Sequence, residues 1–152
     1  MNQGPKSPQP PLLFLGCLLA GWGVGFLHPL RLGLPDAARY WVSALALVCA
    51  ASLGGWGLLT FRRMGTTHEP NGTASALLTS GPFRFSRNPL YLALSATLVG
   101  FALLLDSAWI VILVPVLVLL LDRLVIAREE VRLRTQFGEV YLAYARRVRR
   151  WI

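Results

Sequence analysis

The stretch that decides the fold is residues 90–126, which read LYLALSATLVGFALLLDSAWIVILVPVLVLLLDRLVI. Two apolar runs, 90–105 and 108–126, flank the polar pair Asp106-Ser107. Apolar runs of this length are typical of helices that cross a bilayer, and so short a turn indicates an antiparallel hairpin. At 1.5 Å per residue the first run covers about 24 Å, slightly less than the hydrocarbon core. The stretch therefore predicts a helical hairpin in a membrane, with a short first helix.

Two more apolar runs precede the hairpin, at residues 12–27 and 40–61. The second contains no charged residue and is long enough to cross a bilayer. We interpret the first as a retained helix rather than a signal peptide, because no small-residue cleavage site ends it. Its glycines, among them Gly21 and Gly25, are expected to permit close helix packing. They do not indicate a nucleotide-binding loop, because no strand precedes them.

The last segment, residues 128–152, has a different pattern. Apolar side chains recur every three to four residues with Arg and Glu between them, at Leu133, Phe137, Tyr141, Tyr144 and Val148. This spacing predicts an amphipathic helix that lies along the membrane surface, and Gly138 is a point at which it can break. The expected fold class is all-α: a polytopic helical membrane protein with about four transmembrane helices and a C-terminal amphipathic interfacial helix.

The composition favours a membrane protein over a soluble one. Of the 152 residues, 55% are hydrophobic and only 14% are charged, and the mean hydropathy is +0.54. A soluble domain has about 25% charged residues, with which it covers its core. We expect a single membrane domain over residues 1–152, with a disordered N-terminus at 1–11 and two transmembrane helices within 12–61. The remaining part, 62–152, holds the hairpin and the C-terminal helix.

The positive charge is unevenly distributed. All but three of the fifteen Lys and Arg residues lie within 62–87 and 123–150, next to apolar runs. Such asymmetry is typical of the cytoplasmic side of membrane proteins, so the segment 62–89, the tail and the N-terminus are all expected there. The net charge is +8, but no nucleic-acid-binding motif accompanies it, so nucleic acid is not expected as a partner. The expected partner is the lipid bilayer. Cys17 and Cys49 lie in separate apolar runs and are interpreted as small buried side chains, not as a disulfide or a metal site.

Two polar segments beside the hairpin carry the candidate functional residues. The first, 78–91, reads LTSGPFRFSRNPLY, and the second, 128–144, reads REEVRLRTQFGEVYLAY. Because the hairpin returns the chain to the membrane face that it left, the two segments can meet.

A purely structural role is open for each segment. Asn88 followed by Pro89 is a good start for a helix, since Asn caps helices and Pro fits the first turn. In the second segment, acidic and basic residues three or four positions apart can pair along an exposed helix. These pairs are Glu129 with Arg132 and Glu130 with Arg134.

From about residue 66 to residue 151 the chain resembles the superfamily of isoprenylcysteine carboxyl methyltransferases and phospholipid N-methyltransferases, which are integral membrane enzymes. The first hallmark of that family is GP(Y/F)RYxRHPxY, which residues 81–91 match as GPFRFSRNPLY. An apolar hairpin follows, and then EExxLxxxFGxxYxxYxxxV, which residues 129–148 match as EEVRLRTQFGEVYLAYARRV. The order, the spacing and the intervening hairpin all agree.

The resemblance implies methyl transfer from S-adenosyl-L-methionine to a lipophilic acceptor, with a cofactor pocket in residues 62–152 that opens to the cytoplasm. Glu129 is expected to accept hydrogen bonds from the amine or ribose of the cofactor. Arg87 is expected either to pair with a carboxylate or to hold the loop. The catalytic candidates are Arg87, Asn88 and Glu129. The residues that match cofactor contacts of the family are Ser75, Ala76, Leu77, Leu78, Phe83, Asn88, Pro89, Leu90, Tyr91 and Glu129.

Three departures from the family pattern bear on the acceptor. Asn88 replaces the His of most members, and an amide cannot act as a base or a cation. Ser75 replaces a second His of the prenylcysteine enzymes, and Val125 replaces the Arg with which they grip the carboxylate of the acceptor. Arg123 and Arg128 are the alternative substrate-binding candidates. A small lipid or another apolar metabolite is therefore favoured over a prenylated protein.

Two other functions are compatible with parts of the sequence. Membrane reductases of the sterol type, which use NADPH, carry a similar R-H-P-x-Y segment. The Glu129-Glu130 doublet and the lack of a Cys-bearing motif after it argue against that class. The other alternative is a helical membrane protein that retains the fold without enzymatic activity. Binding of S-adenosyl-L-methionine, of NADPH or of neither separates the three.

Overall fold

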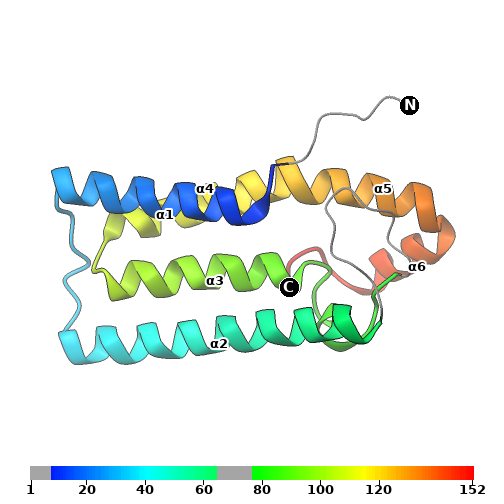
Figure 1. Cartoon of the computed structure of the whole chain (residues 1–152), viewed down its shortest axis with the longest axis horizontal. Coiled ribbons are helices and arrows are strands. Elements are labelled where there is room, and N and C mark those ends of the chain that lie inside the picture. Colours follow the sequence, from blue (N-terminus) through cyan, green and yellow to red (C-terminus); the bar gives the residue numbers. More distant parts are fainter. Residues whose placement is uncertain (1–7, 65–76) are drawn as a thin grey trace.

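The computed structural model describes residues 8–64 and 77–152, and within these ranges every regular element is helical (Figure 1). The predicted all-α fold is therefore confirmed. In chain order the elements are α1 (Pro10–Leu27), α2 (Asp36–Arg63), the 3-10 helix η1 (Gly81–Arg84), α3 (Pro89–Leu104), α4 (Ala108–Leu120), the π-helical segment η2 (Leu121–Ile126), α5 (Ala127–Phe137) and α6 (Glu139–Arg147).

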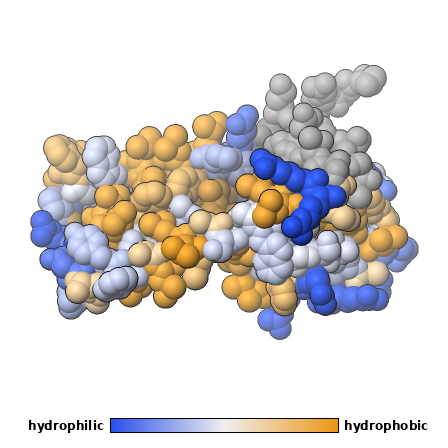
Figure 2. Space-filling view, turned by 60° about the horizontal axis from the view of Figure 1, so that its bottom comes forward, coloured by the Kyte–Doolittle hydropathy of each residue, from blue (hydrophilic) through white to orange (hydrophobic). Residues whose placement is uncertain are grey.

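Four helices lie side by side as a bundle (Figure 1). Three are long and apolar enough to cross a membrane: α1, α2 and the continuous helix over residues 108–137 that contains α4, η2 and α5. The fourth, α3, has 16 residues and is about 24 Å long, as the sequence predicted. Figure 2 shows hydrophobic residues over much of the bundle and hydrophilic residues gathered toward its two ends. The chain is an integral membrane protein.

The predicted hairpin joins α3 to α4. Asp106 in its turn has a positive φ of 51°, and Ser107 caps α4 by accepting a hydrogen bond from the Ile110 N–H at 3.4 Å. Small residues bring the helices close together. A Cβ atom at Gly100 would lie 2.6 Å from the Leu47 side chain, and one at Gly21 would lie 2.8 Å from that of Ile110. The packing role predicted for Gly21 is therefore confirmed.

Some details of the sequence prediction are wrong. The segment 1–11 was expected to be disordered; residues 1–7 lie outside the described residues, but Pro10 and Pro11 already belong to α1, where the missing N–H of proline costs no helix bond. Cys17 is buried as expected, whereas Cys49 is exposed on the outer face of α2.

The C-terminal amphipathic helix is present but divided. Its first part, α5, continues from α4 without a break through the π-helical segment. Gly138, with a φ of 51°, then ends α5, and α6 turns back (Figure 1). Helical structure stops at Arg147, so residues 148–152 form a non-helical tail.

The bundle has two polar ends. One, here called the motif end, holds residues 77–88, α5, α6, the C-terminal tail and the start of α1 (Figure 1). The other, the far end, holds the connection 28–35 and the turn of the hairpin. There the Ala108 N–H donates to the Leu30 carbonyl at 2.9 Å, and Arg39 Nη1 donates to the Leu104 carbonyl at 3.0 Å. The second bond places a positive charge at the C-terminus of α3, where the helix dipole favours it.

Candidate active site

The first motif segment folds back onto the end of α2 through η1. Gly81 has a φ of 59°, and a Cβ atom there would lie 2.6 Å from Thr60 Oγ1. Only glycine satisfies both the backbone conformation and this close approach. Two residues later, the buried Phe83 packs edge-to-face on Phe61, with the ring centres 5.4 Å apart. The Gly-Pro-Phe sequence is thus what fixes this segment on the bundle.

Asn88 and Pro89 begin α3, as was predicted for a purely structural role of this segment. The side chain of Asn88, however, does not cap the helix. Its Nδ2 donates to the carbonyl of Arg150 at 2.9 Å, and its own N–H donates to Ser86 Oγ at 3.1 Å. Asn88 is buried, and its amide is engaged by the C-terminal tail.

One hydrogen bond joins the two motif segments directly. The Tyr91 hydroxyl, in the first turn of α3, donates to Glu129 Oε1 in α5 at 2.7 Å. Tyr91 is buried and Glu129 is half-buried. The two residues are far apart in the chain and meet because the hairpin returns α5 to the end at which α3 begins.

The second acid of the doublet, Glu130, is held between two arginines. Arg87 Nη1 lies 3.1 Å from Glu130 Oε1, and Arg150 Nη2 lies 2.6 Å from Glu130 Oε2. The Glu130 side chain is only 8% exposed and that of Arg87 only 14%, so solvent screens their pair little. Arg150 also donates to Asp122 at 3.1 Å. Glu130 therefore joins three segments, and these pairs replace the one expected with Arg134.

The C-terminal tail completes this network. The hydrogen bonds to Glu130, followed by those to Asp122, raise the pKa of Arg150, which is a cation at any physiological pH. The backbone of the tail contributes as well, because the Arg87 N–H donates to the Arg149 carbonyl at 3.0 Å. The Trp151 indole donates to Asp122 at 3.3 Å.

Two tyrosines of α6 reach the first motif segment. Tyr141 accepts a hydrogen bond from Arg87 Nη1 at 3.1 Å, and the Tyr144 hydroxyl donates to the Phe83 carbonyl at 2.7 Å. Burial raises the pKa of Tyr144 to about 12, so this hydroxyl stays a neutral donor. The turn at Gly138 is what allows α6 to make both contacts.

The other candidates are spread over the motif end. Leu78 is buried, Leu77 is half-buried, and a Cβ atom at Gly57 would meet the side chain of Leu90, which therefore packs on α2. The two substrate-binding candidates differ: Arg123 is exposed, whereas Arg128 is half-buried beside Glu129. Ser75 and Ala76 lie outside the described residues.

Sequence reasoning missed three residues of the network: Asp122, Arg150 and Trp151. Asp122 carried a usable signal, because an acid within an apolar run generally has a buried partner or a function. Arg150 carried none, since it is one of several arginines in a basic tail.

The arrangement gives the two acids different chemical capacities. Glu130 is neutralised by Arg87 and Arg150, so its role in this geometry is to position the motif. Glu129 has the neutral Tyr91 hydroxyl as its hydrogen-bond donor and can attract a cation or accept further bonds from an amine or a hydroxyl. No group of acidic, His or Cys side chains among the described residues is arranged to hold a metal ion.

Comparison with known proteins gives two matches and one negative result. An uncharacterized protein from Haemophilus influenzae is 37% identical over 65 residues, which are 41% of this chain and the whole of that protein. No solved structure matches the chain. The family model for phospholipid methyltransferases matches residues 38–140, from α2 to the start of α6. Since that match spans more than half of the chain and contains the first motif segment and most of the second, the chain belongs to the phospholipid methyltransferase family.

Proposed function

We propose that this protein transfers a methyl group from S-adenosyl-L-methionine to a lipophilic acceptor at the cytoplasmic face of a membrane. The observation that carries the proposal is the hydrogen bond of 2.7 Å between Tyr91 and Glu129, which unites the two motif segments at one end of the bundle. Membership of a methyltransferase family supports the type of reaction.

The residues present fit the proposed cofactor. When bound, S-adenosyl-L-methionine supplies a methyl group on a sulfonium cation, which a carboxylate and aromatic faces stabilise. Glu129 is a carboxylate that accepts a hydrogen bond from the neutral Tyr91 hydroxyl, and Tyr91 and Phe83 are aromatic residues at the same end. Leu77 and Leu78 supply apolar surface for the adenine. Glu129 would then accept hydrogen bonds from the amine or ribose.

Arg87 and Asn88 take supporting roles in this proposal. Arg87 is already engaged by Glu130 and Tyr141, and the side-chain amide of Asn88 is engaged by the Arg150 carbonyl. Both therefore fix the start of α3, which presents Pro89, Leu90 and Tyr91 to the cofactor.

The acceptor is proposed to enter sideways from the bilayer. At the motif end the apolar helices meet the basic, amphipathic α5 and α6, an arrangement typical of a membrane interface. Arg128 is the better candidate to bind a polar group of the acceptor, because it is half-buried next to Glu129 while Arg123 is exposed. The concentration of arginines at this end supports a cytoplasmic orientation.

Titration of the purified protein in detergent with S-adenosyl-L-methionine tests the proposal. Glu129→Gln removes a charged acceptor from a half-buried site and is expected to cost about 1.5–3 kcal/mol, or roughly tenfold to a hundredfold in affinity. The matched control is Glu139→Gln, because the Glu139 side chain is 85% exposed and its pair with Arg146 spans 3.6 Å.

Equal affinities for the two variants would mean that Glu129 does not contact the cofactor. A parallel titration with NADPH separates the reductase alternative, and binding of neither cofactor would identify a member of the family without this activity.

A further inference from the structure

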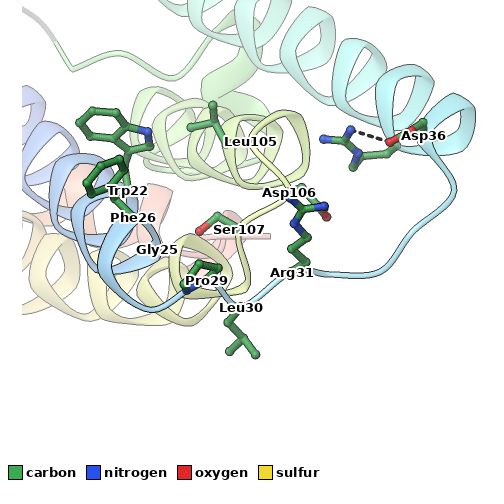
Figure 3. Close-up of a pocket in the computed structure, with 11 residues that line it drawn as sticks. Trp22, Gly25, Phe26, Pro29, Leu30, Arg31, Asp36, Leu105, Asp106 and Ser107 are labelled. Carbon is green, nitrogen blue, oxygen red and sulfur yellow. Dashed lines mark hydrogen bonds and ion pairs between the residues drawn. The ribbon is translucent and has the colours of Figure 1, made fainter.

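A polar cavity lies at the far end of the bundle (Figure 3). It has a volume of about 480 Å³ and is formed by the end of α1, the connection 28–35, the start of α2 and the turn of the hairpin. The length of α3, about 24 Å, separates this cavity from Asn88 at the motif end. The cavity is therefore distinct from the proposed active site.

One side of the cavity is apolar and open to the surroundings of the protein. Trp22 and Phe26, on the last turns of α1, are 55% and 80% exposed, and Leu30 is 46% exposed. Figure 3 shows the two aromatic side chains on the same side of the cavity. In a membrane these side chains lie where the apolar belt meets the polar end, so acyl chains can reach this wall.

The opposite side carries charges of both signs. Arg39 is buried, and its two terminal nitrogens donate to the Leu104 carbonyl and to Asp36, while its buried Nε has no hydrogen-bond partner among the described residues. Asp106 accepts a hydrogen bond from the Leu32 N–H at 3.2 Å. Arg31 is exposed, lines the cavity, and has no hydrogen bond or ion pair with any residue that the structure describes.

These charges define the chemistry of a ligand. Arg31 is an available cation of the kind that binds phosphate, since guanidinium and phosphate oxygens match in geometry. Asp36, whose side chain is 81% exposed, and Asp106 offer carboxylate oxygens to a cationic donor. Two arginines and two aspartates leave the cavity without net charge, so a ligand with a net negative charge gains little there.

We propose that the far-end cavity binds the headgroup of a zwitterionic phospholipid that carries a primary ammonium, as phosphatidylethanolamine does. The phosphate pairs with Arg31 and the ammonium donates to Asp106 and Asp36, while an acyl chain runs along Trp22 and Phe26. A choline headgroup fits less well because its quaternary nitrogen has no N–H to donate. The lipid belongs to the leaflet opposite the motif end and is held there, not methylated.

Quenching of tryptophan fluorescence by brominated lipids tests this proposal on the full-length protein in vesicles. Both sets of vesicles contain phosphatidylethanolamine and phosphatidylcholine. In one set only the phosphatidylethanolamine is brominated near its headgroup, and in the other set only the phosphatidylcholine is. The brominated lipid has the same mole fraction in both sets. The difference between the wild type and Trp22→Phe isolates the quenching of Trp22. The corresponding difference for Trp41→Phe is the control, because Trp41 is 78% exposed but does not line the cavity.

Trp22 is expected to be quenched preferentially by phosphatidylethanolamine, by about two- to fivefold, the range of one exposed ion pair. Arg31→Gln should abolish this preference, and Trp41 should show none. Arg31 has no partner among the described residues, so the Arg31→Gln variant is expected to fold like the wild type. Equal quenching by both lipids would overturn the proposal, since it means unselective contact with the bilayer. Stronger quenching by brominated phosphatidylglycerol would overturn it as well, in favour of a simple anion site.

Discussion

At the scale of single residues, we expect the stability of the motif end to depend on Glu130 more than on any other acidic residue there. Its carboxylate is 8% exposed and lies 3.1 Å from Arg87 and 2.6 Å from Arg150. Removing one member of a buried ionic group leaves the others desolvated and unpaired, which costs far more than the group contributes when complete.

Glu130→Met is therefore expected to lower the free energy of unfolding by about 3–5 kcal/mol. In a chain of this size that corresponds to a drop of roughly 10 °C in the melting temperature measured in detergent. Glu139→Met, at an exposed position of the neighbouring helix, should change stability by no more than about 0.5 kcal/mol. The double variant Arg87→Met/Glu130→Met should recover part of the loss, because it removes the buried charge left unpaired. If Glu130→Met melts like Glu139→Met, the network contributes nothing to stability.

The motif residues also show what single positions in a sequence can and cannot reveal. Asn88 and Pro89 were predicted to start a helix from local preferences alone, and they do. The pairing of Glu130 with Arg134 was a reasonable local expectation as well, because the two are four residues apart. It is replaced by pairs with Arg87 and Arg150, which tertiary folding brings closer. Local spacing carries no information about such distant partners.

At the scale of elements, the position of α6 depends on the turn at Gly138. Its φ of 51° lies in the region that residues with a side chain rarely adopt. The turn sends α6 back so that Tyr141 reaches Arg87 and Tyr144 reaches Phe83. A straight continuation of α5 would remove both contacts.

Gly138→Ala is expected to destabilise this turn by about 1–2 kcal/mol and to weaken binding of S-adenosyl-L-methionine severalfold. The chain offers a matched control in Gly33→Ala. Gly33 has a φ of 71°, and neither glycine has a neighbour within 4 Å of an added Cβ atom. Gly33 lies at the far end, so its variant should lose comparable stability without losing affinity. A similar loss of affinity in both variants would show that the effect is one of general destabilisation.

The helices themselves were predictable because hydrophobic length determines them. The four apolar runs each gave a helix, and Asp106-Ser107 gave the turn between α3 and α4. The path of the C-terminal segment was harder to predict from the sequence. Its period is helical throughout, so periodicity could not show that α5 continues from α4 or that the chain leaves the helix after Arg147. Contacts of Arg150 and Trp151 with Asp122 decide the course of that tail.

At the scale of the whole molecule, the fold separates two polar ends by a bundle with an apolar surface (Figure 2). Both motif segments and the C-terminal tail gather at one end, as the hairpin predicted. A polar cofactor cannot cross a bilayer unaided. The cofactor must therefore be supplied on the side of the membrane that the motif end faces. With a cytoplasmic motif end, sealed inside-out vesicles should methylate when labelled cofactor is added outside, and sealed right-side-out vesicles should not.

The nature of the methylated product then tests the proposed acceptor. Methyl transfer is an in-line displacement, in which a lone pair on the acceptor forms the new bond as the methyl–sulfur bond breaks. A carboxylate or thiolate acceptor needs no base, whereas an amine with a pKa near about 10.4 must first lose a proton. Asn88 cannot take that proton, and its amide is bound to the Arg150 carbonyl. We therefore expect an acceptor that is already anionic or neutral.

Inside-out vesicles supplied with methyl-labelled cofactor should accordingly place the label in the organic extract. Mild alkali distinguishes the products, because a methyl ester releases its label as volatile methanol while thioethers and N-methyl groups retain it. Label confined to the aqueous phase would exclude a lipophilic acceptor. Alkali-stable label on the amine headgroups of phospholipids would show that a base other than residue 88 acts at this site. Glu129 would then be the first group to examine, because its carboxylate accepts a hydrogen bond from the Tyr91 hydroxyl, whereas that of Glu130 is paired with Arg87 and Arg150.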